Sequence, residues 1–444
     1  MKTLFGTDGV RGRANEHVTA ELALSLARAA AARLIPPGGR VIIGRDTRLS
    51  GPMLEGAMAA GFASAGVDVL LAGIIPTPAI SFLIKDERAD LGAVISASHN
   101  EPEDNGIKFF DRKGMKLTVE KEDAIEQALA NLPPRSRSVG SISPLQAAGT
   151  RYAAFLTGTI ETEDIDLSGL TIIVDCAYGA TGAIAPHVLR HFNARVVEMH
   201  TAPDGNRINR KCGSTHLQGL REAVLTQHAD LGIAFDGDGD RVLLISPSGE
   251  TIDGDHMLGI AALDMHQRGA LNPAIVVATV MSNMGLEHAL AQSGIDMLRT
   301  PVGDRHVAHA MLVHGAHLGG EQSGHIIFSD HSPTGDGILT AIKLLEISHE
   351  RRTPLHDLAE EIPLYPQARA DVVVAEPGEI ITDPHVVSAV KKAEERLATQ
   401  GRLVVRPSGT QPVVRVLVEA MDERFCNDVC EQVASAIHAA SAVR

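Results

Sequence analysis

Residues 231–241 read LGIAFDGDGDR. The apolar run from Leu231 to Phe235 is followed at once by three aspartates, which stand at alternate positions with glycine between them. A short apolar run bounded by turn residues predicts a buried strand of a parallel sheet. Ligands of open α/β sheets collect beyond the ends of such strands. This stretch therefore predicts an α/β fold with a polar site at a strand end.

The aspartates of this stretch, Asp236, Asp238 and Asp240, predict a metal site. The intervening glycines let the backbone turn so that hard oxygen donors converge, and such donors suit Mg²⁺. A calcium loop of the EF-hand type is excluded because Arg241 stands at its glycine position and Pro247 at its final glutamate position. A solvated acidic turn is the other alternative, but it gives no reason for a third aspartate after a fully apolar strand.

A hydroxyl follows a second apolar run. Leu91 to Ile95 precedes Ser96-Ala97-Ser98-His99-Asn100, and Lys108 comes shortly after. The serine-hydrolase elbow is absent around Ser98, and the chain has no Gly-Lys pair and hence no P-loop. In transfer through a phosphoserine, Mg²⁺ and lysine offset the phosphoryl charge. The two stretches together indicate such a transfer, against the alternative that Ser98 only caps backbone groups.

Two further segments carry polar groups suited to a phosphosugar. Arg406-Pro407-Ser408-Gly409-Thr410, with Arg415 beyond it, has the composition of a phosphate cradle, although a plain turn is an alternative. Glu321-Gln322-Ser323-Gly324-His325 combines an acid, an amide, a hydroxyl and an imidazole. These groups suit sugar hydroxyls or proton transfer, although a lone histidine is more often structural.

Length and charge narrow the class of protein. The 444 residues predict several domains, and no apolar run is long enough to span a bilayer. The formal net charge of −15 argues against binding to nucleic acid or acidic membranes. The segment from Met1 to Gly6 lacks a signal-peptide pattern, so a cytoplasmic protein is expected. The four cysteines predict small buried thiols rather than a disulfide framework.

An anionic substrate would need basic groups that are concentrated locally against this negative charge. Five arginines beside the motif-like segments are the candidates: Arg45, Arg48, Arg241, Arg406 and Arg415.

Strands and helices alternate in three similar passes along the chain. The passes predict three related mixed α/β domains, followed by a smaller C-terminal α+β domain, around a central cleft. The predicted domains are 1–148, 149–253, 254–365 and 366–444. The predicted strands of the three passes are 41–44, 67–71, 91–95, 171–175, 194–199, 231–235 and 274–279. The predicted helices are 53–65, 183–191, 285–292 and 302–313.

The motifs occur in an order that resembles the α-D-phosphohexomutase superfamily and, within it, the bacterial phosphoglucosamine mutase family. They extend across the whole chain and are the following: Phe5-Gly6-Thr7-Asp8-Gly9-Val10-Arg11-Gly12, Ser96 to Asn100, Asp104 to Phe110, Asp236 to Arg241, Val302-Gly303-Asp304-Arg305, Gly320 to His325, and Arg406 to Thr410. Gln322, the opening segment and Cys212-Gly213-Ser214-Thr215-His216 resemble the amino-sugar branch.

The resemblance implies a role for each site residue. Ser98 carries the phosphoryl group and completes a Mg²⁺ site, one per active site, with Asp236, Asp238 and Asp240. The residues implied around the phosphoserine are Arg11, His99 and Lys108, with Lys108 and His325 as proton-transfer candidates and Arg241 as support of the metal loop. The implied sugar ligands are Gly303, Glu321 and Ser323. The implied ligands of the non-reacting phosphate are Arg406, Ser408, Gly409, Thr410 and Arg415.

The implied activity is the interconversion of glucosamine 6-phosphate and glucosamine 1-phosphate through a 1,6-bisphosphate, which also serves as activator. The product feeds amino-sugar nucleotides and cell-wall precursors. The resemblance is compatible with a homodimer. Three departures from the family pattern, Glu101, Tyr178 and Gln411, bear on substrate preference and rate, because a carboxylate at Glu101 would repel a phosphoserine unless it points away.

Three alternatives remain open at this point. A phosphoglucomutase or phosphomannomutase would use the same chemistry on another sugar. A haloacid-dehalogenase-like phosphatase would use Asp236 as nucleophile, but it gives no role to the third aspartate or to the Arg406 segment. A non-catalytic phosphosugar-binding regulator would have no need of Ser98 opposite three aspartates.

Overall fold

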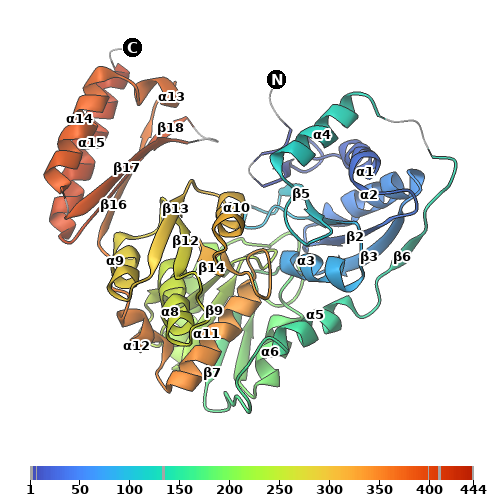
Figure 1. Ribbon diagram of the computed structural model, residues 1–444, viewed down its shortest axis with the longest axis horizontal. Coiled ribbons are helices and arrows are strands. Elements are labelled where there is room, and N and C mark those ends of the chain that lie inside the picture. The colour runs from blue at the N-terminus through green and yellow to red at the C-terminus, as the bar shows by residue number, and fades with distance from the viewer. Residues whose placement is uncertain (1–3, 7, 133–135, 399, 409–411, 443–444) are drawn as a thin grey trace. The chain divides into compact units, whose positions relative to one another are not determined.

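A computed structural model describes residues 4–6, 8–132, 136–398, 400–408 and 412–442 (Figure 1). The chain divides into two compact units. Unit 1 comprises Met1–Thr279 and Ile295–Glu360, and unit 2 comprises Val280–Gly294 and Glu361–Arg444. No helix in the described ranges is long and apolar enough to cross a membrane.

Unit 1 contains three sheets. The first has the order β1-β5-β4-β2-β3-β6, the second β11-β10-β9-β7-β8 and the third β13-β12-β14-β15. Their strands are β1 Val10–Arg13, β2 Arg40–Arg45, β3 Asp68–Ile74, β4 Leu91–Ile95, β5 Asp104–Asp111, β6 Ile142–Pro144, β7 Thr171–Asp175, β8 Arg195–Met199, β9 Leu231–Phe235, β10 Val242–Ile245, β11 Thr251–Ile252, β12 Ile275–Thr279, β13 Asp296–Thr300, β14 Leu318–Gly320 and β15 Ile326–Phe328.

The same four-strand arrangement recurs in all three sheets. The first strand of each set (β2, β7, β12) pairs in parallel with the second (β3, β8, β13) and the third (β4, β9, β14). The fourth (β5, β10, β15) returns antiparallel to the third. The multidomain α/β architecture with three related sheets is therefore confirmed, whereas the domain boundaries given above stay a prediction.

Helices follow the strands of unit 1, as expected for βαβ connections (Figure 1). They are α1 Ala20–Leu34, α2 Gly51–Ser64, α3 Thr77–Asp86, α4 Val119–Ala130, α5 Ala148–Thr157, α6 Ala185–His191, α7 Gln218–Gln227, α8 Gly254–Gln267, α10 Asp304–His314, α11 Gly337–Arg351 and α12 Leu355–Glu360. Every residue of β4 and β9 is buried, which explains why both strands are continuous apolar runs in the sequence.

Unit 2 contains a three-stranded antiparallel sheet of order β16-β18-β17. Its elements are α9 Met284–Gln292, β16 Gln367–Val373, α13 Pro377–Ile380, α14 Pro384–Leu397, β17 Gly401–Pro407, β18 Val413–Ala420 and α15 Glu423–Ala442. Val414, Val416 and Val418 alternate along β18 and pack in one core with residues of α14 and α15. The opposite face of the sheet is thereby left for polar residues. The predicted small α+β domain is confirmed.

Candidate active site

Three loops occupy equivalent places in the three sheets, each between the third and the fourth strand of its set. The loop after β4 holds Ser98, the loop after β9 holds the three aspartates, and the loop after β14 holds Glu321 and His325. The structure brings them together: Ser98 Oγ lies 2.6 Å from Asp236 Oδ2, and His325 Nδ1 lies 3.7 Å from Asp240 Oδ2. The repeated topology thus supplies three walls of one site.

Asp236, Asp238 and Asp240 form a buried set of oxygen donors. One carboxylate oxygen from each lies within 4.8 Å of the other two. Asp238 Oδ1 and Asp240 Oδ1 are buried and have no hydrogen-bond partner among the described residues. Such orphaned oxygens are costly unless something positive fills the space between them. The set therefore fits a hard divalent cation.

The electrostatics of these aspartates point the same way. Burial, together with the charges of Asp240 and Asp238, raises the pKa of Asp236 well above its usual range. Burial opposes ionisation of Asp240 as well, but Lys108, His325 and Arg241 outweigh it and hold its pKa well below the usual range. Adjacent buried carboxylates whose pKa values shift in opposite directions are typical of functional sites.

Gly237 explains how the loop reaches Ser98. A Cβ at this position would lie 2.8 Å from the carbonyl oxygen of Ser98. Any side chain would therefore push the two loops apart.

Ser98 itself has a left-handed backbone with φ of 51°, which a non-glycine residue seldom adopts and which costs about 1 kcal/mol. Its side chain is 1% exposed, and its Oγ lies 3.3 Å from His99 Nδ1. Burial and the cations Arg241 and Arg11 lower the pKa of His99 to about 4, so this imidazole is neutral near pH 7.

Lys108, on β5, is 2% exposed and contacts carboxylates on two sides. Its Nζ lies 3.0 Å from Asp238 Oδ2 and 3.2 Å from Asp8 Oδ2. Burial disfavours the ammonium, but Asp238, Asp8 and Asp240 outweigh burial and raise the pKa of Lys108. The side chain is therefore protonated and positively charged in this arrangement.

Asp8, Lys116 and Asp304 complete this network of charges, and none of them was assigned a role from the sequence. Lys116 contacts both Asp8 and Asp304, and Arg11 contacts Asp8 as well. The sequence did contain a signal for Asp8 and Asp304, because they lie in the motifs Phe5 to Gly12 and Val302 to Arg305. Lys116 follows β5 and forms an isolated antiparallel bridge with Phe110. It had no signal in the sequence, because only the folded chain brings it to these carboxylates.

The third loop holds the predicted sugar ligands. Glu321 Oε1 accepts a hydrogen bond from the Gly303 amide at 3.0 Å, and Ser323 Oγ is a buried hydroxyl that lacks a partner among the described residues. The Gly335 amide donates to His325 Nε2 at 3.1 Å, which leaves the proton of a neutral ring on Nδ1, facing Asp240. Burial disfavours the charged ring, but the Asp240 carboxylate, 3.7 Å from Nδ1, outweighs burial and raises the pKa of His325.

One of the five arginines was assigned wrongly. Arg48 is fully buried and its side-chain donors all bind acceptors of the protein, so it is not available to an anionic ligand. Arg45 pairs with Glu55 at 3.1 Å. The burial of Arg48 could not be foreseen because four of its five side-chain acceptors lie fifty or more residues away in the sequence. The backbone amide of Arg241 donates to Asp236 Oδ1 at 3.2 Å, and the role of its side chain as support of the metal loop stays a prediction.

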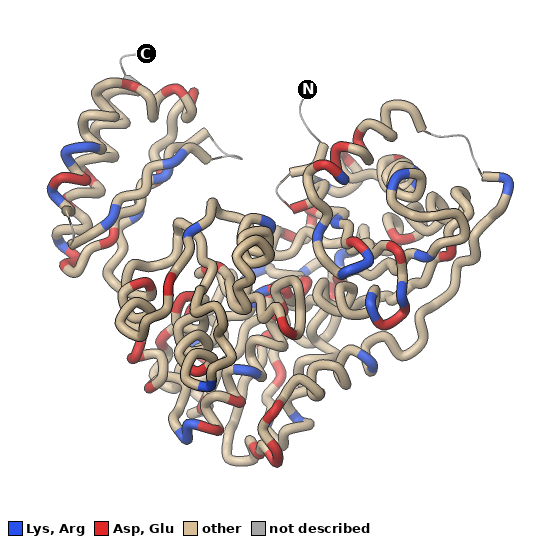
Figure 2. The backbone as a smooth tube through the Cα atoms, viewed as in Figure 1, with Lys and Arg blue, Asp and Glu red and all other residues tan. Residues whose placement is uncertain are grey.

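Unit 2 places Arg415 on the face of its sheet that points away from the core, because Arg415 alternates along β18 with the core residues Val414 and Val416. Figure 2 marks the Lys and Arg positions along the backbone of this unit in blue. Arg406 and Arg415 are directly opposite each other on β17 and β18, and they line a cavity of about 290 Å³ together with Arg369. Arg406 Nε is buried without a partner among the described residues, and burial and Arg415 lower the pKa of Arg406. Adjacent like charges of this kind suit an anion.

Arg369 is an addition to the predicted set, because it lines the same cavity as Arg406 and Arg415 and lies in no motif of the sequence. Ser408 is described, and its amide donates to Val413 O at 2.9 Å. Gly409 and Thr410, and the departure at Gln411, lie outside the described residues.

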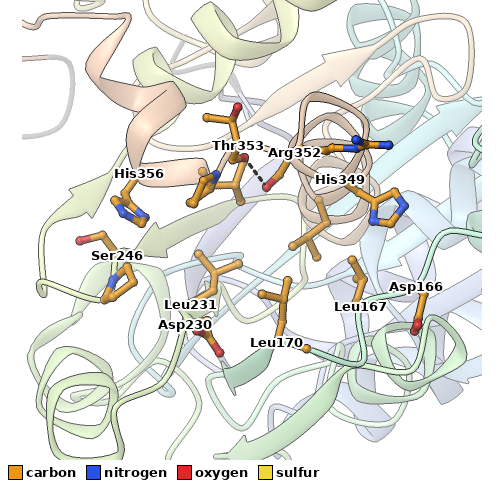
Figure 3. A pocket seen from close by; sticks show the side chains of 16 residues that line it. Asp166, Leu167, Leu170, Asp230, Leu231, Ser246, His349, Arg352, Thr353 and His356 are labelled. Atoms are coloured by element: carbon orange, nitrogen blue, oxygen red, sulfur yellow. Dashed lines mark hydrogen bonds between the residues drawn. The ribbon is translucent and has the colours of Figure 1, made fainter.

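A further cavity of about 590 Å³ lies in unit 1, away from this chemistry (Figure 3). Leucine and proline side chains form much of its lining, including Leu167, Leu170 and Leu231. It sits at the opening end of β9, whereas the aspartates follow the closing end. None of the predicted site residues lines it.

Comparison with known proteins agrees with this geometry. Families described as phosphoglucomutase/phosphomannomutase match in four parts: α/β/α domain I over residues 2–135, domain II over 150–249, domain III over 253–365 and the C-terminal domain over 367–436. A protein named phosphoglucosamine mutase from Desulforudis audaxviator is 47% identical over 439 residues, which cover 97% of this chain and 97% of the relative. One of the same name from Syntrophomonas wolfei is 45% identical over 100% of both chains.

Among solved structures, a phosphoglucomutase/phosphomannomutase family protein from Burkholderia thailandensis superposes with a TM-score of 0.83 at 26% identity. The match covers 99% of this chain and 98% of that chain.

Proposed function

The chain belongs to the phosphoglucomutase/phosphomannomutase family, and we propose that it is a phosphoglucosamine mutase that interconverts glucosamine 6-phosphate and glucosamine 1-phosphate. The reaction proceeds through a phosphoserine and a hexosamine 1,6-bisphosphate, and it supplies amino-sugar nucleotides and cell-wall precursors. Full-length relatives of that name support the choice of sugar over the phosphoglucomutase and phosphomannomutase alternatives.

The observation that carries the mechanism is the contact between Ser98 Oγ and Asp236 Oδ2 at 2.6 Å. A hydroxyl at the edge of a buried carboxylate set is placed to carry a phosphoryl group next to a cation. In the phosphatase alternative Asp236 would be the nucleophile, yet Ser98 would then occupy the position that a substrate phosphate needs. That alternative therefore explains the contact less well.

The transfer exchanges one P–O bond for another. The bond between phosphorus and Ser98 Oγ breaks and a bond to a sugar hydroxyl oxygen forms. The proton that the sugar hydroxyl loses goes to a proton-transfer group of the site, and Ser98 Oγ gains one proton in return, so the serine hydroxyl is restored. Asp236, Asp238 and Asp240 would hold a divalent cation, which we take to be Mg²⁺ and which would neutralise phosphoryl charge. Lys108 and Arg11 supply further positive charge around Ser98.

Proton transfer is assigned to Lys108 and His325. The raised pKa of Lys108 favours its charged form, so we expect it to act as a donor toward a phosphoryl oxygen. His325 keeps a proton on Nδ1 beside Asp240 and is the second candidate.

The remaining parts of the substrate have their own ligands. Gly303, Glu321 and Ser323 bind sugar hydroxyls, and Arg406, Ser408, Gly409, Thr410 and Arg415 bind the non-reacting phosphate. Arg369 belongs with this phosphate set. A bisphosphate serves as activator because it can restore the phosphoserine. The cytoplasmic location and the homodimer stay predictions.

Comparison of turnover of glucosamine, glucose and mannose phosphates, with a trace of hexose bisphosphate present, tests the assignment. We expect the highest kcat/KM with glucosamine phosphate. A preference for glucose or mannose phosphate would move the protein to the phosphoglucomutase or phosphomannomutase branch. Release of inorganic phosphate without isomerisation would indicate the phosphatase.

A further inference from the structure

Arg48 is a fully buried arginine whose five N–H donors all have acceptors in unit 1. Its exposed fraction is 0%. The acceptors are the carboxylate of Asp46 and the backbone carbonyls of Ser98, Asn100, Glu101 and Asp104. Nη2 lies 3.1 Å from Ser98 O and 2.8 Å from Asn100 O, and Nη1 lies 2.9 Å from Asp104 O. An arginine with no donor left for a ligand has a structural role, and here that role is to fix the backbone of the Ser98 loop.

Asp46 fixes Arg48 and also reaches this loop by a second path. Its Oδ2 lies 2.9 Å from Arg48 Nε and accepts from Ser96 Oγ at 2.6 Å. The same Ser96 Oγ accepts from the Ser98 amide at 2.9 Å. Both polar groups of the Ser98 backbone are therefore tied to one buried ion pair.

Asn209, which follows β8 of the second sheet, donates hydrogen bonds to two of the same carbonyls, those of Ser98 and Asn100. Its Nδ2 lies 2.8 Å from Ser98 O and 3.0 Å from Asn100 O, and its side chain is buried. The Asn209 amide donates to Ala177 O at 3.1 Å, which anchors it beyond β7. The nucleophile loop of one sheet is thus clamped by residues from two sheets.

We propose that Arg48 and Asn209 are positioning residues for the reaction of Ser98. By holding the carbonyls of Ser98 and Asn100, they keep Ser98 in the left-handed conformation that places its Oγ against Asp236. Neither residue touches the reacting atoms. A left-handed serine relaxes when its surroundings no longer hold it, and a shift of about 1 Å in a reacting group costs about 100-fold in rate. The role in catalysis rests on the proposed function, but the hold on the loop does not.

Asn209→Asp is the decisive variant. The aspartate keeps the size of the side chain and tolerates the left-handed backbone of this position, with φ of 61°, but it has no N–H to donate. We expect single-turnover transfer from phosphorylated enzyme to glucosamine 6-phosphate to slow about 100-fold, with KM changed by less than about threefold. Asn206→Asp, at an exposed position of the same loop, is the matched control and should behave as wild type.

Hydrogen exchange of the loop amides provides a readout that does not depend on the reaction. Asn209→Asp should speed exchange at Ser98 and Asn100 about tenfold or more, while amides of β4 keep wild-type protection. Arg48→Lys keeps a charge but cannot reach five acceptors, and it should show a larger effect of the same kind if it folds. Asn209→Asp decides the matter if Arg48→Lys does not fold.

The outcomes separate the two proposals. If the wild-type enzyme carries no phosphoryl group on Ser98, the proposed function fails, and hydrogen exchange alone then judges the clamp. Unchanged exchange at Ser98 and Asn100 in folded Asn209→Asp would overturn the clamp. Faster exchange with an unchanged transfer rate would overturn the positioning role, because it would show that the loop is held without consequence for the chemistry.

Discussion

The carboxylates of Asp236, Asp238 and Asp240 are the residues on which the chemistry depends most. They are buried within one loop, and two of their oxygens have no partner among the described residues. Lys108 alone cannot balance them, since it also contacts Asp8. A bound cation would therefore stabilise the buried oxygens that the protein leaves without a partner.

Asp238→Asn should weaken Mg²⁺ binding and slow turnover by about two orders of magnitude, or about 3 kcal/mol of transition-state stabilisation. The amide replaces one charged donor of the set and leaves its shape. Titration calorimetry with Mg²⁺ and steady-state kinetics measure the two effects. Asp230→Asn, at the other end of β9, is the control. Full activity of wild-type enzyme in excess chelator would contradict the metal assignment.

Glu101 shows how a departure from the family pattern is accommodated. Its carboxylate is exposed and faces Arg210, with Nε 3.6 Å away, so it points away from Ser98. Only its backbone carbonyl takes part in the clamp. The other departure in the described residues, Tyr178, packs against His200 with ring centroids 4.6 Å apart.

At the scale of elements, helix α11 links buried polar groups to the metal loop. Its N-cap Asp336 accepts from the Leu339 amide at 3.0 Å and from the Tyr152 hydroxyl at 2.7 Å. The Gly337 amide donates to Gly239 O at 3.0 Å, within the loop of aspartates. The N-cap therefore determines where α11 begins, and the first residue of the helix supplies a hydrogen bond to the loop of aspartates.

Burial raises the pKa of Asp336 from an ordinary value of 3.8 to about 6. The folded protein thus binds this proton more tightly than the unfolded chain does, so the free energy of unfolding falls as pH rises from about 4 to about 6. Asp336→Asn keeps an acceptor for the cap but cannot ionise. Its stability relative to wild type should therefore rise across this window, by about 2–3 kcal/mol at most.

Urea unfolding of both proteins at several pH values between 4 and 7 measures this difference. Asp253→Asn, the same change at the N-cap of α8, separates the titration of Asp336 from the general loss of a charged cap. Parallel stability profiles of wild type and Asp336→Asn would contradict the buried titration.

Elements also show what sequence patterns can and cannot predict. The bounds of β4 and β9 agree with the prediction because fully buried strands are continuous apolar runs. The bounds of β7 agree as well, since its centre, Ile172 to Val174, is apolar and buried. The antiparallel fourth strands, β5, β10 and β15, were missed because polar or short segments hide their pattern. Contacts such as those of Arg48 and Lys116 join distant parts of the chain and leave no local signature.

For the molecule as a whole, the repeated sheet explains why one site can draw on three parts of the sequence. In each of the three sheets the loop between the third and the fourth strand carries one part of the site: Ser98, the three aspartates, or the proposed sugar ligands. Unit 2 adds a basic face in a chain whose net charge is −15, so positive charge is concentrated where a phosphate is proposed to bind. Because the bisphosphate must present either end for reaction, one phosphate site must accept both ends.

Arg415→Ala should therefore weaken binding of glucosamine 1-phosphate and glucosamine 6-phosphate alike, by about 1.5–3 kcal/mol for a charge-assisted contact. Phosphorylation of Ser98 should remain detectable. Kinetics in both directions measure the effect, and Arg424→Ala on α15 is the control within the same unit. A defect confined to one isomer would mean that the arginine pair binds only one end of the sugar.

The most direct test of the account is to locate the phosphoryl group on the enzyme after incubation with hexose 1,6-bisphosphate. Peptide mass spectrometry should place an acid-stable phosphate on Ser98, and Ser98→Ala should lose both the phosphate and nearly all turnover, because no other nucleophile can replace a covalent carrier. A hydroxylamine-labile phosphate on Asp236, with Ser98 unmodified, would contradict the mutase mechanism and assign the nucleophile to the carboxylate.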